Sequence, residues 1–337
     1  MRLTIAAPLF PPQIGGPAKY AKELFDELNR RGLKPRLVVW GRAERLLPWG
    51  ARHLWYFFRL LPRVIGSDAV LALDTWSVGF PALCAAKLCG EKFLARVGGD
   101  ILWEGYIERT GEMVPLSGFY ATKRNFTLKE RVIYGVTGFL ARHAGMLLFN
   151  TLWQMEIWRK AYNIDIGRMR LLENEYSGER HETPAPRGKK IFLAAGRGIA
   201  YKNIAGFEEA FSEAAKRHPD IELDTRPLPR EEHLARLAGI YAYVVPSVSE
   251  VNSNNIIEAL KYGKPFMAPR DSGMFEKLQG LGVFADTLDK KAMEAGLEEL
   301  LDAEKYKQYV GRIRAFSYTH SWAQIADEVL DTANSIA

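Results

Sequence analysis

Two glutamates flank a dense polar patch in the run PSVSEVNSNNIIEALKYGKPF, in the second half of the chain. Glu250 and Glu258 are eight positions apart, so in one continuous helix they would point about 80 degrees away from each other. The run YAYVVPS predicts a buried strand and NSNNIIEALKYG predicts a helix. We expect Glu250 on the loop after the strand and Glu258 in the helix, with both bordering a pocket at the helix N-terminus. The alternative for Glu258 is a solvated position on an ordinary helix.

The residues between the two glutamates suit the binding of an anion. They are types that favour helix N-termini, where free N–H groups attract negative charge. These residues are Asn252, Ser253, Asn254 and Asn255.

Two cations follow the apolar run KIFLAAG in the segment GRGIAYKN. Arg197 offers a bidentate fork and Lys202 a point charge, a combination that could hold a diphosphate. The alternative is two solvated surface cations, which is where most lysines and arginines lie.

A glycine pair follows the predicted N-terminal strand. Gly15 and Gly16 would let a phosphate approach the backbone, and Pro17 favours the first turn of a helix. The run does not match G-x-G-x-x-G, which argues against a nicotinamide dinucleotide. A plain tight turn is the alternative.

The composition predicts a soluble globular protein of two domains. The chain has 337 residues, 47% hydrophobic and 26% charged, and a single core rarely serves more than about 300 residues. The formal net charge of +6 favours an anionic partner, but no basic run or aromatic RNA motif points to nucleic acid. Cys84 and Cys89 lie in an apolar run and are expected to be buried thiols.

Apolar strand patterns alternate with helical patterns along both halves of the chain. The first series ends near residue 162, a polar and proline-bearing connection covers 179–190, and a second series follows. Residues 98–125 are expected to be irregular. This order predicts an α/β fold of two doubly wound, Rossmann-like domains with a cleft between them.

These motifs together resemble the retaining GT-B glycosyltransferases of family 4. Glu250 and Glu258 match the E-x7-E signature of that family, and the resemblance covers nearly the whole chain, most loosely over 98–142. The other matching residues fall in the family's order: Gly15, Gly16, Asn174, Arg197, Lys202, Gly263, Pro265, Ser272, Gly273 and Glu276. The resemblance implies an acceptor-binding domain over 1–165, a nucleotide-sugar domain over 166–315, and a helix over 316–337 that returns to the first domain.

The resemblance also implies a role for each site residue. Arg197 and Lys202 would neutralise the diphosphate and stabilise the leaving group without a metal. Glu250 would contact the donor sugar and Glu258 the ribose, while the backbone of 252–255 and the pair Gly15–Gly16 would line the donor site. The acceptor would attack on the face that the diphosphate leaves, and a leaving-group oxygen would take its proton.

One departure from the family concerns the acceptor side. The run RVGGDILWEG places Asp100, Trp103 and Glu104 just beyond a predicted strand, where many members carry a histidine near the reacting sugar. Asp100 is the candidate for that catalytic place, and a loop N-cap is its alternative. The sequence has no D-x-D pair and scattered histidines, so we expect no metal and no cofactor besides the nucleotide sugar.

The run WGARHLWYFFRLLPRVIG, residues 49–66, admits two interpretations. An aromatic, arginine-bearing amphipathic helix can lie on an anionic membrane surface and bring an enzyme to a lipid-linked acceptor. The same pattern also describes a helix packed on its own sheet. The N-terminal apolar run is too short for a signal peptide, so the expected location is the cytoplasm, with or without contact to the inner face of the membrane.

The sequence thus predicts a hexosyltransferase that moves a sugar from a UDP- or GDP-sugar to a glycan or lipid-linked acceptor, as in polysaccharide biosynthesis. Two alternatives stay open. The first is a nucleotide-sugar 2-epimerase on the same fold, and the second is a non-catalytic nucleotide-binding partner in polysaccharide assembly.

Overall fold

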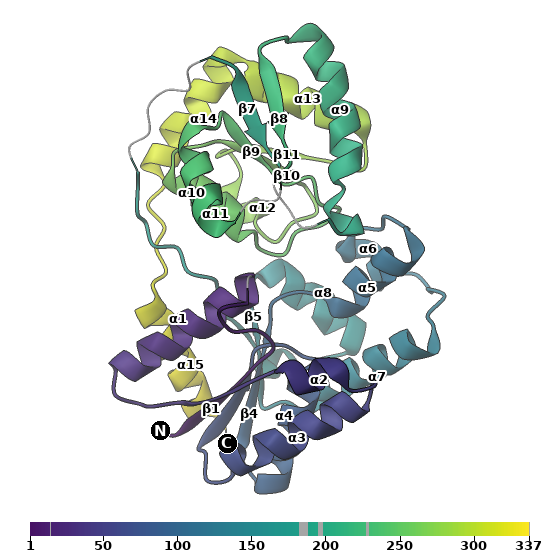
Figure 1. Cartoon of the computed structure of the whole chain (residues 1–337), viewed down its shortest axis with the longest axis vertical. Helices are drawn as coiled ribbons and strands as arrows, with labels where there is room; N and C mark the ends of the chain where they lie inside the picture. The colour runs from purple at the N-terminus through teal and green to yellow at the C-terminus, as the bar shows by residue number, and fades with distance from the viewer. Residues whose placement is uncertain (14, 182–187, 195–197, 227–228, 337) are drawn as a thin grey trace. The chain divides into compact units, whose positions relative to one another are not determined.

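The chain forms two compact units, shown in Figure 1. The computed structural model describes residues 1–336 except 14, 182–187, 195–197 and 227–228. The first unit comprises Met1–Leu102, Lys123–Glu175 and His320–Ala337, and the second comprises Trp103–Thr122 and Tyr176–Thr319. These boundaries differ from those expected from the sequence, because Trp103–Thr122 packs with the second unit although it lies within the first series of strands.

The first unit is built on a six-stranded parallel sheet with the strand order β2-β1-β3-β4-β5-β6. Its strands are β1 (Leu3–Ala7), β2 (Arg36–Val39), β3 (Ala69–Ala72), β4 (Lys92–Val97), β5 (Met146–Phe149) and β6 (Met169–Leu171). All residues of β1, β3 and β5 are buried, as expected for strands covered by helices on both faces.

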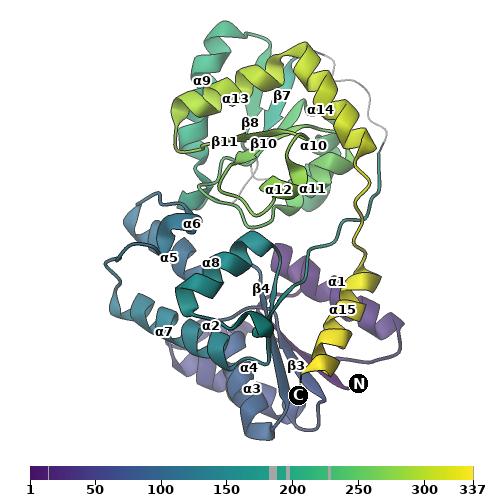
Figure 2. The ribbon, with the colours of Figure 1, turned by 180° about the vertical axis from the view of Figure 1, so that it is seen from behind.

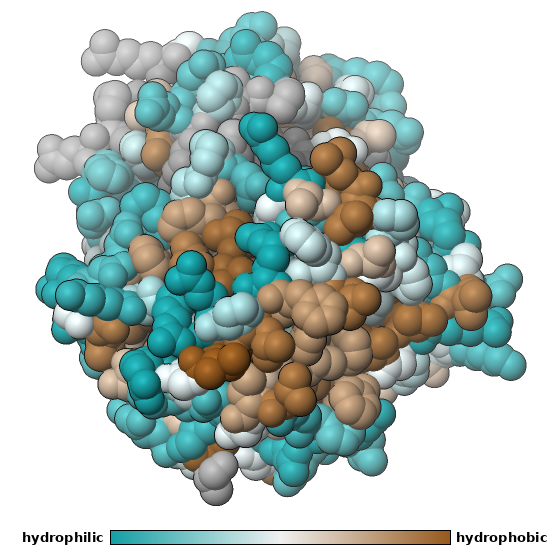
Figure 3. Space-filling view, turned by 60° about the horizontal axis from the view of Figure 1, so that its bottom comes forward, coloured by the Kyte–Doolittle hydropathy of each residue, from teal (hydrophilic) through white to brown (hydrophobic). Residues whose placement is uncertain are grey.

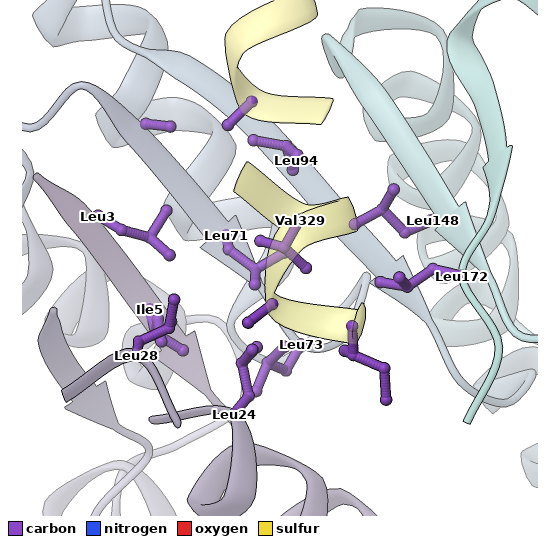
Figure 4. Close-up of a cluster of buried hydrophobic side chains, with 14 of the residues drawn as sticks. Leu3, Ile5, Leu24, Leu28, Leu71, Leu73, Leu94, Leu148, Leu172 and Val329 are labelled. Carbon is purple, nitrogen blue, oxygen red and sulfur yellow. The ribbon is translucent and has the colours of Figure 1, made fainter. Parts of the chain in front are cut away.

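Helices α1 (Gly16–Arg30) and α15 (Trp322–Ser335) lie side by side on one face of this sheet, as Figures 1 and 2 show. Figure 4 shows Val329 of α15 among leucines of the sheet and of α1, such as Leu24 and Leu71. The C-terminal helix therefore completes the core of the first unit. The other helical segments that begin in this unit are α2 (Arg42–Leu46), α3 (Ala51–Val64), α4 (Gly79–Cys89), α5 (Ile101–Thr110), α7 (Leu128–His143), α8 (Leu152–Tyr162) and η1 (Ile166–Arg168).

The second unit has a five-stranded parallel sheet with the strand order β11-β10-β9-β7-β8. Its strands are β7 (Lys190–Leu193), β8 (Ile221–Asp224), β9 (Ala242–Val244), β10 (Phe266–Pro269) and β11 (Val283–Ala285). Its helices are α6 (Leu116–Phe119), η2 (Ala200–Lys202), α9 (Ile204–Arg217), α10 (Arg230–Gly239), α11 (Asn254–Lys261), α12 (Phe275–Leu278), α13 (Lys290–Leu301) and α14 (Ala303–Ala315). Two separate apolar clusters, one with α9 and α13 and one with α11 and α12, cover opposite faces of the sheet.

Both units are therefore doubly wound α/β structures, and the predicted fold class is confirmed in each. The stretch 98–125 is more regular than expected, since it contains α5 and α6. Most of the proline-bearing part of the predicted connection, 182–187, lies outside the described residues.

Candidate functional site

An ion pair between Lys202 and Glu250 lies at the carboxyl edge of the second sheet. Lys202 ends η2, which follows β7, and Glu250 lies on the loop after β9. The Nζ atom of Lys202 donates a hydrogen bond of 2.8 Å to Oε2 of Glu250. The side chains are 20% and 13% exposed, so both are largely shielded from water while a part of each remains open. The fold thus joins two residues that are far apart in the sequence.

The surroundings of Lys202 keep it positively charged. Burial lowers its pKa, but the Glu250 carboxylate, Tyr201 and Glu104 raise it, and the net pKa lies above the ordinary value of lysine. The Nζ atom is also 5.0 Å from the centroid of the Tyr201 ring, within the range of a cation–π contact. A lysine held as a cation in a partly dry position is suited to bind an anion.

Backbone and side-chain contacts fix the loop that carries Glu250. Its backbone pairs with that of Ser272, in the loop after β10, as an isolated parallel bridge. The Ser247 hydroxyl donates a hydrogen bond of 3.2 Å to the Glu250 carboxylate. The Val248 N–H donates one of 2.8 Å to the carbonyl of Tyr201, next to Lys202. The ion pair is therefore positioned by three loops that leave the same edge of the sheet.

Glu258 lies on α11, as predicted, and its side chain is turned inward. It is 5% exposed, which excludes the alternative of a solvated helix position. Tyr243, a buried residue of β9, accepts a hydrogen bond of 2.7 Å from the Asn255 amide. Burial raises the Tyr243 pKa, and the charges of Glu258 and Glu250 raise it further. Both glutamates therefore lie within electrostatic reach of one phenol.

The N-terminus of α11 is formed by the predicted polar residues, but without the expected side-chain cap. Ser253 is the N-cap, yet within the described residues its hydroxyl accepts no hydrogen bond from the first turn. The backbone N–H of Ser253 donates a hydrogen bond of 3.0 Å to the Met274 sulfur. The Asn252 Oδ1 atom is buried and has no hydrogen-bond partner in the described part of the chain. The helix dipole at this end is thus not neutralised by the side chain of its own N-cap.

The segment Trp103–Thr122 also contributes to the surroundings of Lys202, which the sequence did not predict. The Trp103 ring lies 5.0 Å from the Tyr201 ring, centroid to centroid. The Glu108 carboxylate accepts a hydrogen bond of 2.9 Å from the N–H of Ala200, the first residue of η2. The available signal was the run ILWEG, whose aromatic and acidic residues directly follow a strand.

Gly15 and Gly16 begin α1 at the carboxyl end of β1 in the first unit. Gly15 is the N-cap and has φ 144°, a conformation that only glycine adopts without strain. Pro17 occupies the first turn, as expected. This helix start also has no side-chain cap within the described residues, so it presents backbone N–H groups rather than a polar side chain.

Asp100 lies at the carboxyl end of the first sheet and is 2% exposed. Its Oδ2 atom accepts a hydrogen bond of 3.0 Å from the indole N–H of Trp158, on α8. The neighbouring Gly99 carbonyl accepts one of 3.0 Å from Gln154, on the same helix. Asp100 is therefore anchored by α8, and it directly precedes α5, the place that the N-cap alternative gives it.

A further polar residue at this edge, Arg96, was missed by the sequence analysis. It lies on β4, is 5% exposed, and donates a hydrogen bond of 2.6 Å to the Asn174 amide oxygen. Its guanidinium also stacks over the Tyr20 ring at 3.7 Å. The signal was present in FLARV, where one charged residue interrupts a buried strand.

The predicted residues are divided between the two units. Gly15, Gly16 and Asp100 belong to the first, and the second contains Lys202, Glu250, Asn252, Ser253, Asn254, Asn255 and Glu258. Arg197 lies outside the described residues. Of the predicted site, the structure therefore displays the Lys202–Glu250 pair, the inward Glu258 and two helix N-termini.

Comparison with known proteins identifies the fold. No family model matches the chain, and no curated protein matches it. Among solved structures, sucrose-phosphate synthase from Thermosynechococcus elongatus matches with a TM-score of 0.70 at 11% identity, over 99% of this chain and 98% of that one. A trehalose-phosphate synthase (UDP-forming) from Burkholderia xenovorans, in complex with glucose-6-phosphate, matches with a TM-score of 0.66 at 12% identity, over 99% of this chain and 100% of that one.

A third structure is a putative UDP-N-acetylglucosamine 2-epimerase from Listeria monocytogenes, with a TM-score of 0.59 at 15% identity over 99% and 96% of the two chains. At such low identity these likenesses show the fold alone. The chain has the GT-B fold, which confirms the predicted architecture. Within the described ranges, every helix is too short or too polar to traverse a bilayer.

Proposed function

We propose that the protein is a retaining glycosyltransferase with the residue set of family 4. It moves a hexose from a UDP- or GDP-sugar to a glycan or lipid-linked acceptor, without a metal. The observation that carries this proposal is the Lys202–Glu250 ion pair at the carboxyl edge of the second sheet, where parallel α/β sheets bind their ligands. The match of the whole chain to sugar-phosphate synthases supports it.

Lys202 is the residue that meets the donor diphosphate. An ammonium has three N–H donors, and one of them reaches Glu250, so the others are available to phosphate oxygens. The charge of Lys202 stabilises the negative charge that grows on the leaving phosphate as the sugar bond breaks. Arg197, four residues after β7, adds the second cation.

Glu250 and Glu258 hold the two sugars of the donor. Glu250 is oriented by Lys202 and Ser247, and its carboxylate accepts hydrogen bonds from hydroxyls of the transferred hexose. Glu258, buried on α11, accepts from the ribose diol. The N–H groups at the start of α11 support the diphosphate between them.

Proton transfer needs no carboxylate pair around the reacting bond. The acceptor hydroxyl attacks on the face that the diphosphate leaves, its oxygen bonds to the anomeric carbon, and its proton passes to the departing phosphate oxygen. Retention follows because the new bond forms on the side of the old one. Asp100, held by Trp158 in the first unit, orients an acceptor hydroxyl.

Binding of nucleotides is the direct test. We expect calorimetry with UDP, GDP, ADP and their hexose conjugates to show one preferred nucleoside diphosphate. Glu258→Gln is expected to weaken that binding about tenfold, because a neutral amide accepts a weaker hydrogen bond from the diol than a carboxylate does. Glu304→Gln, at an exposed position of α14 in the same unit and outside the matched motifs, serves as the control. Failure of every nucleoside diphosphate to bind the wild type would rule the proposal out.

A 2-epimerase is the second candidate, favoured by the likeness to the Listeria structure. The two activities differ in what they require. An epimerase converts the nucleotide sugar alone, whereas a transferase consumes the donor in proportion to the acceptor. Chromatography of each nucleotide sugar after incubation without acceptor separates them, since an epimeric product under those conditions identifies the epimerase.

We further propose that an anionic membrane surface binds the first unit through α3. Tyr56, Leu60 and Val64 of this helix pack inward, which agrees with the packed-helix interpretation for that side. A second apolar side nevertheless remains exposed, with Leu54 59% and Phe58 58% exposed. Figure 3 brings this end of the unit forward and shows a broad hydrophobic area there.

The exposed residues around α3, here called the α3 face, combine apolar and basic side chains. The large apolar members are Leu46, Trp49, Leu54, Trp55, Phe58, Ile65 and Leu88, and the exposed basic ones are Arg42, Arg45, Arg59, Arg63 and Lys87. The sequence has no acidic residue between Glu44 and Asp68. Apolar insertion with positive charge beside it is complementary to a bilayer of anionic lipids, and it would bring the acceptor domain to a lipid-linked substrate.

Vesicle sedimentation tests the α3 face. We expect the protein to sediment with vesicles containing phosphatidylglycerol but not with pure phosphatidylcholine, and to be released by high salt because electrostatic attraction is screened. Changing Trp55 and Phe58 together to Ser should abolish sedimentation. The same change at Leu152 and Ile166, exposed residues elsewhere in the unit, should leave it intact. A dimer that the Trp55 and Phe58 changes dissolve would instead identify a protein interface.

A further inference from the structure

Arg96 is a buried cation without a carboxylate partner among the described residues. Its contacts are the hydrogen bond to the neutral Asn174 amide and the stacking on Tyr20. Burial lowers the pKa of Arg96, although a guanidinium remains charged at any physiological pH. Carboxylates on neighbouring loops have other partners, since Asp100 accepts from Trp158 and Glu175 lies 4.0 Å from Lys19.

Such an arrangement is costly for stability. A buried charge is normally paired with an opposite charge, because the loss of its hydration must be offset. The Nε atom of Arg96 is buried and has no hydrogen-bond partner in the described part of the chain. A neutral side chain of similar length would fill the same space without this penalty. The residue is therefore better explained by a ligand than by the packing of the sheet.

A glycine beside Arg96 leaves the space next to the guanidinium free of a side chain. Gly98 is exposed, and a Cβ atom added there would lie 2.8 Å from Nη1 of Arg96. The parallel register of β4 and β5 pairs Val97 with Phe149, so Gly98 and Asn150 follow at the same edge. The Asn150 Oδ1 atom is buried and also has no hydrogen-bond partner among the described residues.

We propose that Arg96 binds an oxyanion, a phosphate or carboxylate, carried by the sugar acceptor. This inference rests on the proposed glycosyl transfer and specifies its acceptor as a negatively charged sugar. The guanidinium offers paired N–H donors suited to such a group, and Gly98 admits it. Asn150 adds a polar side chain at the rim, and Tyr20 and Asn174 hold the guanidinium from behind.

The first test compares charged and neutral sugars by calorimetry. Wild type is expected to bind glucose 6-phosphate or glucuronate at least tenfold more tightly than glucose. Tight binding of glucose 6-phosphate would identify the group as a phosphate, and tight binding of glucuronate would identify it as a carboxylate. Arg96→Met should lose that preference by about 10- to 100-fold, the range of one or two charged hydrogen bonds. It should also keep or raise the melting temperature, since it removes an unpaired buried charge. Arg170→Met, which removes an exposed arginine of β6 with a neutral Thr332 partner, is the control for loss of one positive charge in the same unit.

Gly98→Ala provides a second variant that keeps the charge. The added methyl meets only the end of a flexible side chain, so the protein should fold. The Arg96 guanidinium must shift, however, and the space through which an anion reaches it becomes smaller. We expect this variant to lose the preference for anionic sugars as well. If wild type binds glucose and its anionic derivatives equally, or if Gly98→Ala binds them as wild type does, Arg96 is a structural residue.

Nucleotide binding separates this inference from the proposed function. Arg96→Met should bind the preferred nucleoside diphosphate as tightly as wild type. A loss of nucleotide affinity with unchanged sugar affinity would assign the guanidinium to the donor and overturn the inference. Binding of anionic sugars that depends on Arg96, in a protein that binds no nucleotide, would retain the anion site and remove the glycosyltransferase proposal.

Discussion

Replacing Lys202 by methionine is expected to lower the rate of sugar transfer by about 100- to 1000-fold, the usual effect of removing one group that stabilises developing charge. Methionine keeps the unbranched shape and most of the length of the side chain and removes its ammonium. The diphosphate then leaves without its charged partner, and Glu250 loses the contact at 2.8 Å that orients it. The decrease should appear in kcat as well as in kcat/KM, because the stabilised charge is largest in the transition state. Steady-state kinetics with saturating donor measure it.

Lys261→Met is the control for this variant. Lys261 has a similarly shielded side chain, 14% exposed, and forms an ion pair with Glu179 in the same unit. Its replacement removes an equivalent cation at the end of α11 opposite to the N-terminus that is proposed to support the diphosphate. Equal loss of activity in both variants would point to general destabilisation, and full activity of Lys202→Met would contradict the proposed electrostatic role.

Glu250→Gln is expected to move the alkaline limit of activity to lower pH. Burial lowers the pKa of Lys202, and the Glu250 charge is the largest influence that raises it. When that charge is removed, burial is less opposed and the pKa of Lys202 falls. Because the protonated lysine is the active form, activity is lost as pH rises through this pKa, which the variant reaches earlier. The activity itself should also fall, since a hydrogen-bond acceptor for the sugar is weakened.

The shape of the pH profile distinguishes this effect from simple loss of sugar binding. We expect kcat/KM of the variant to decline at a lower pH than that of wild type, after each curve is scaled to its own maximum. Glu104→Gln should move the limit in the same direction by a smaller amount, because Glu104 raises the same pKa less. An alkaline limit that stays in place in Glu250→Gln would show that Lys202 does not govern it.

Most of the fold could be predicted from the sequence because parallel strands buried on both faces are nearly continuous apolar runs. The runs LTIAA and MLLF, which form β1 and β5, can be predicted as strands from their own residues, without knowledge of the neighbouring strands. The region around α5 and α6 could not be predicted in the same way. Its helices are short, and Trp103 contacts Tyr201, a residue nearly one hundred positions away. Local periodicity does not contain such a contact.

The site could be predicted where charged residues lie on the segments that directly follow predicted strands. Lys202, Glu250 and Glu258 were each found by that rule, but the hydrogen bond between the first two depends on β7 and β9 being neighbours in the sheet. Arg96 was missed because a strand pattern is judged by its apolar residues, so one arginine within it was counted as part of the strand. That Arg96 has no carboxylate partner among the described residues can be recognised only from the three-dimensional structure.

The path of the chain limits how this protein can be cut or recombined. The chain changes unit after Leu102, Thr122, Glu175 and Thr319, so each unit is made of separate stretches of sequence. A fragment ending near Glu175 would lack α15, which completes the first core, and would separate Trp103–Thr122 from the residues it packs against. Exchange of the second unit with that of a protein of the same fold would therefore have to carry Trp103–Thr122 along and leave α15 behind.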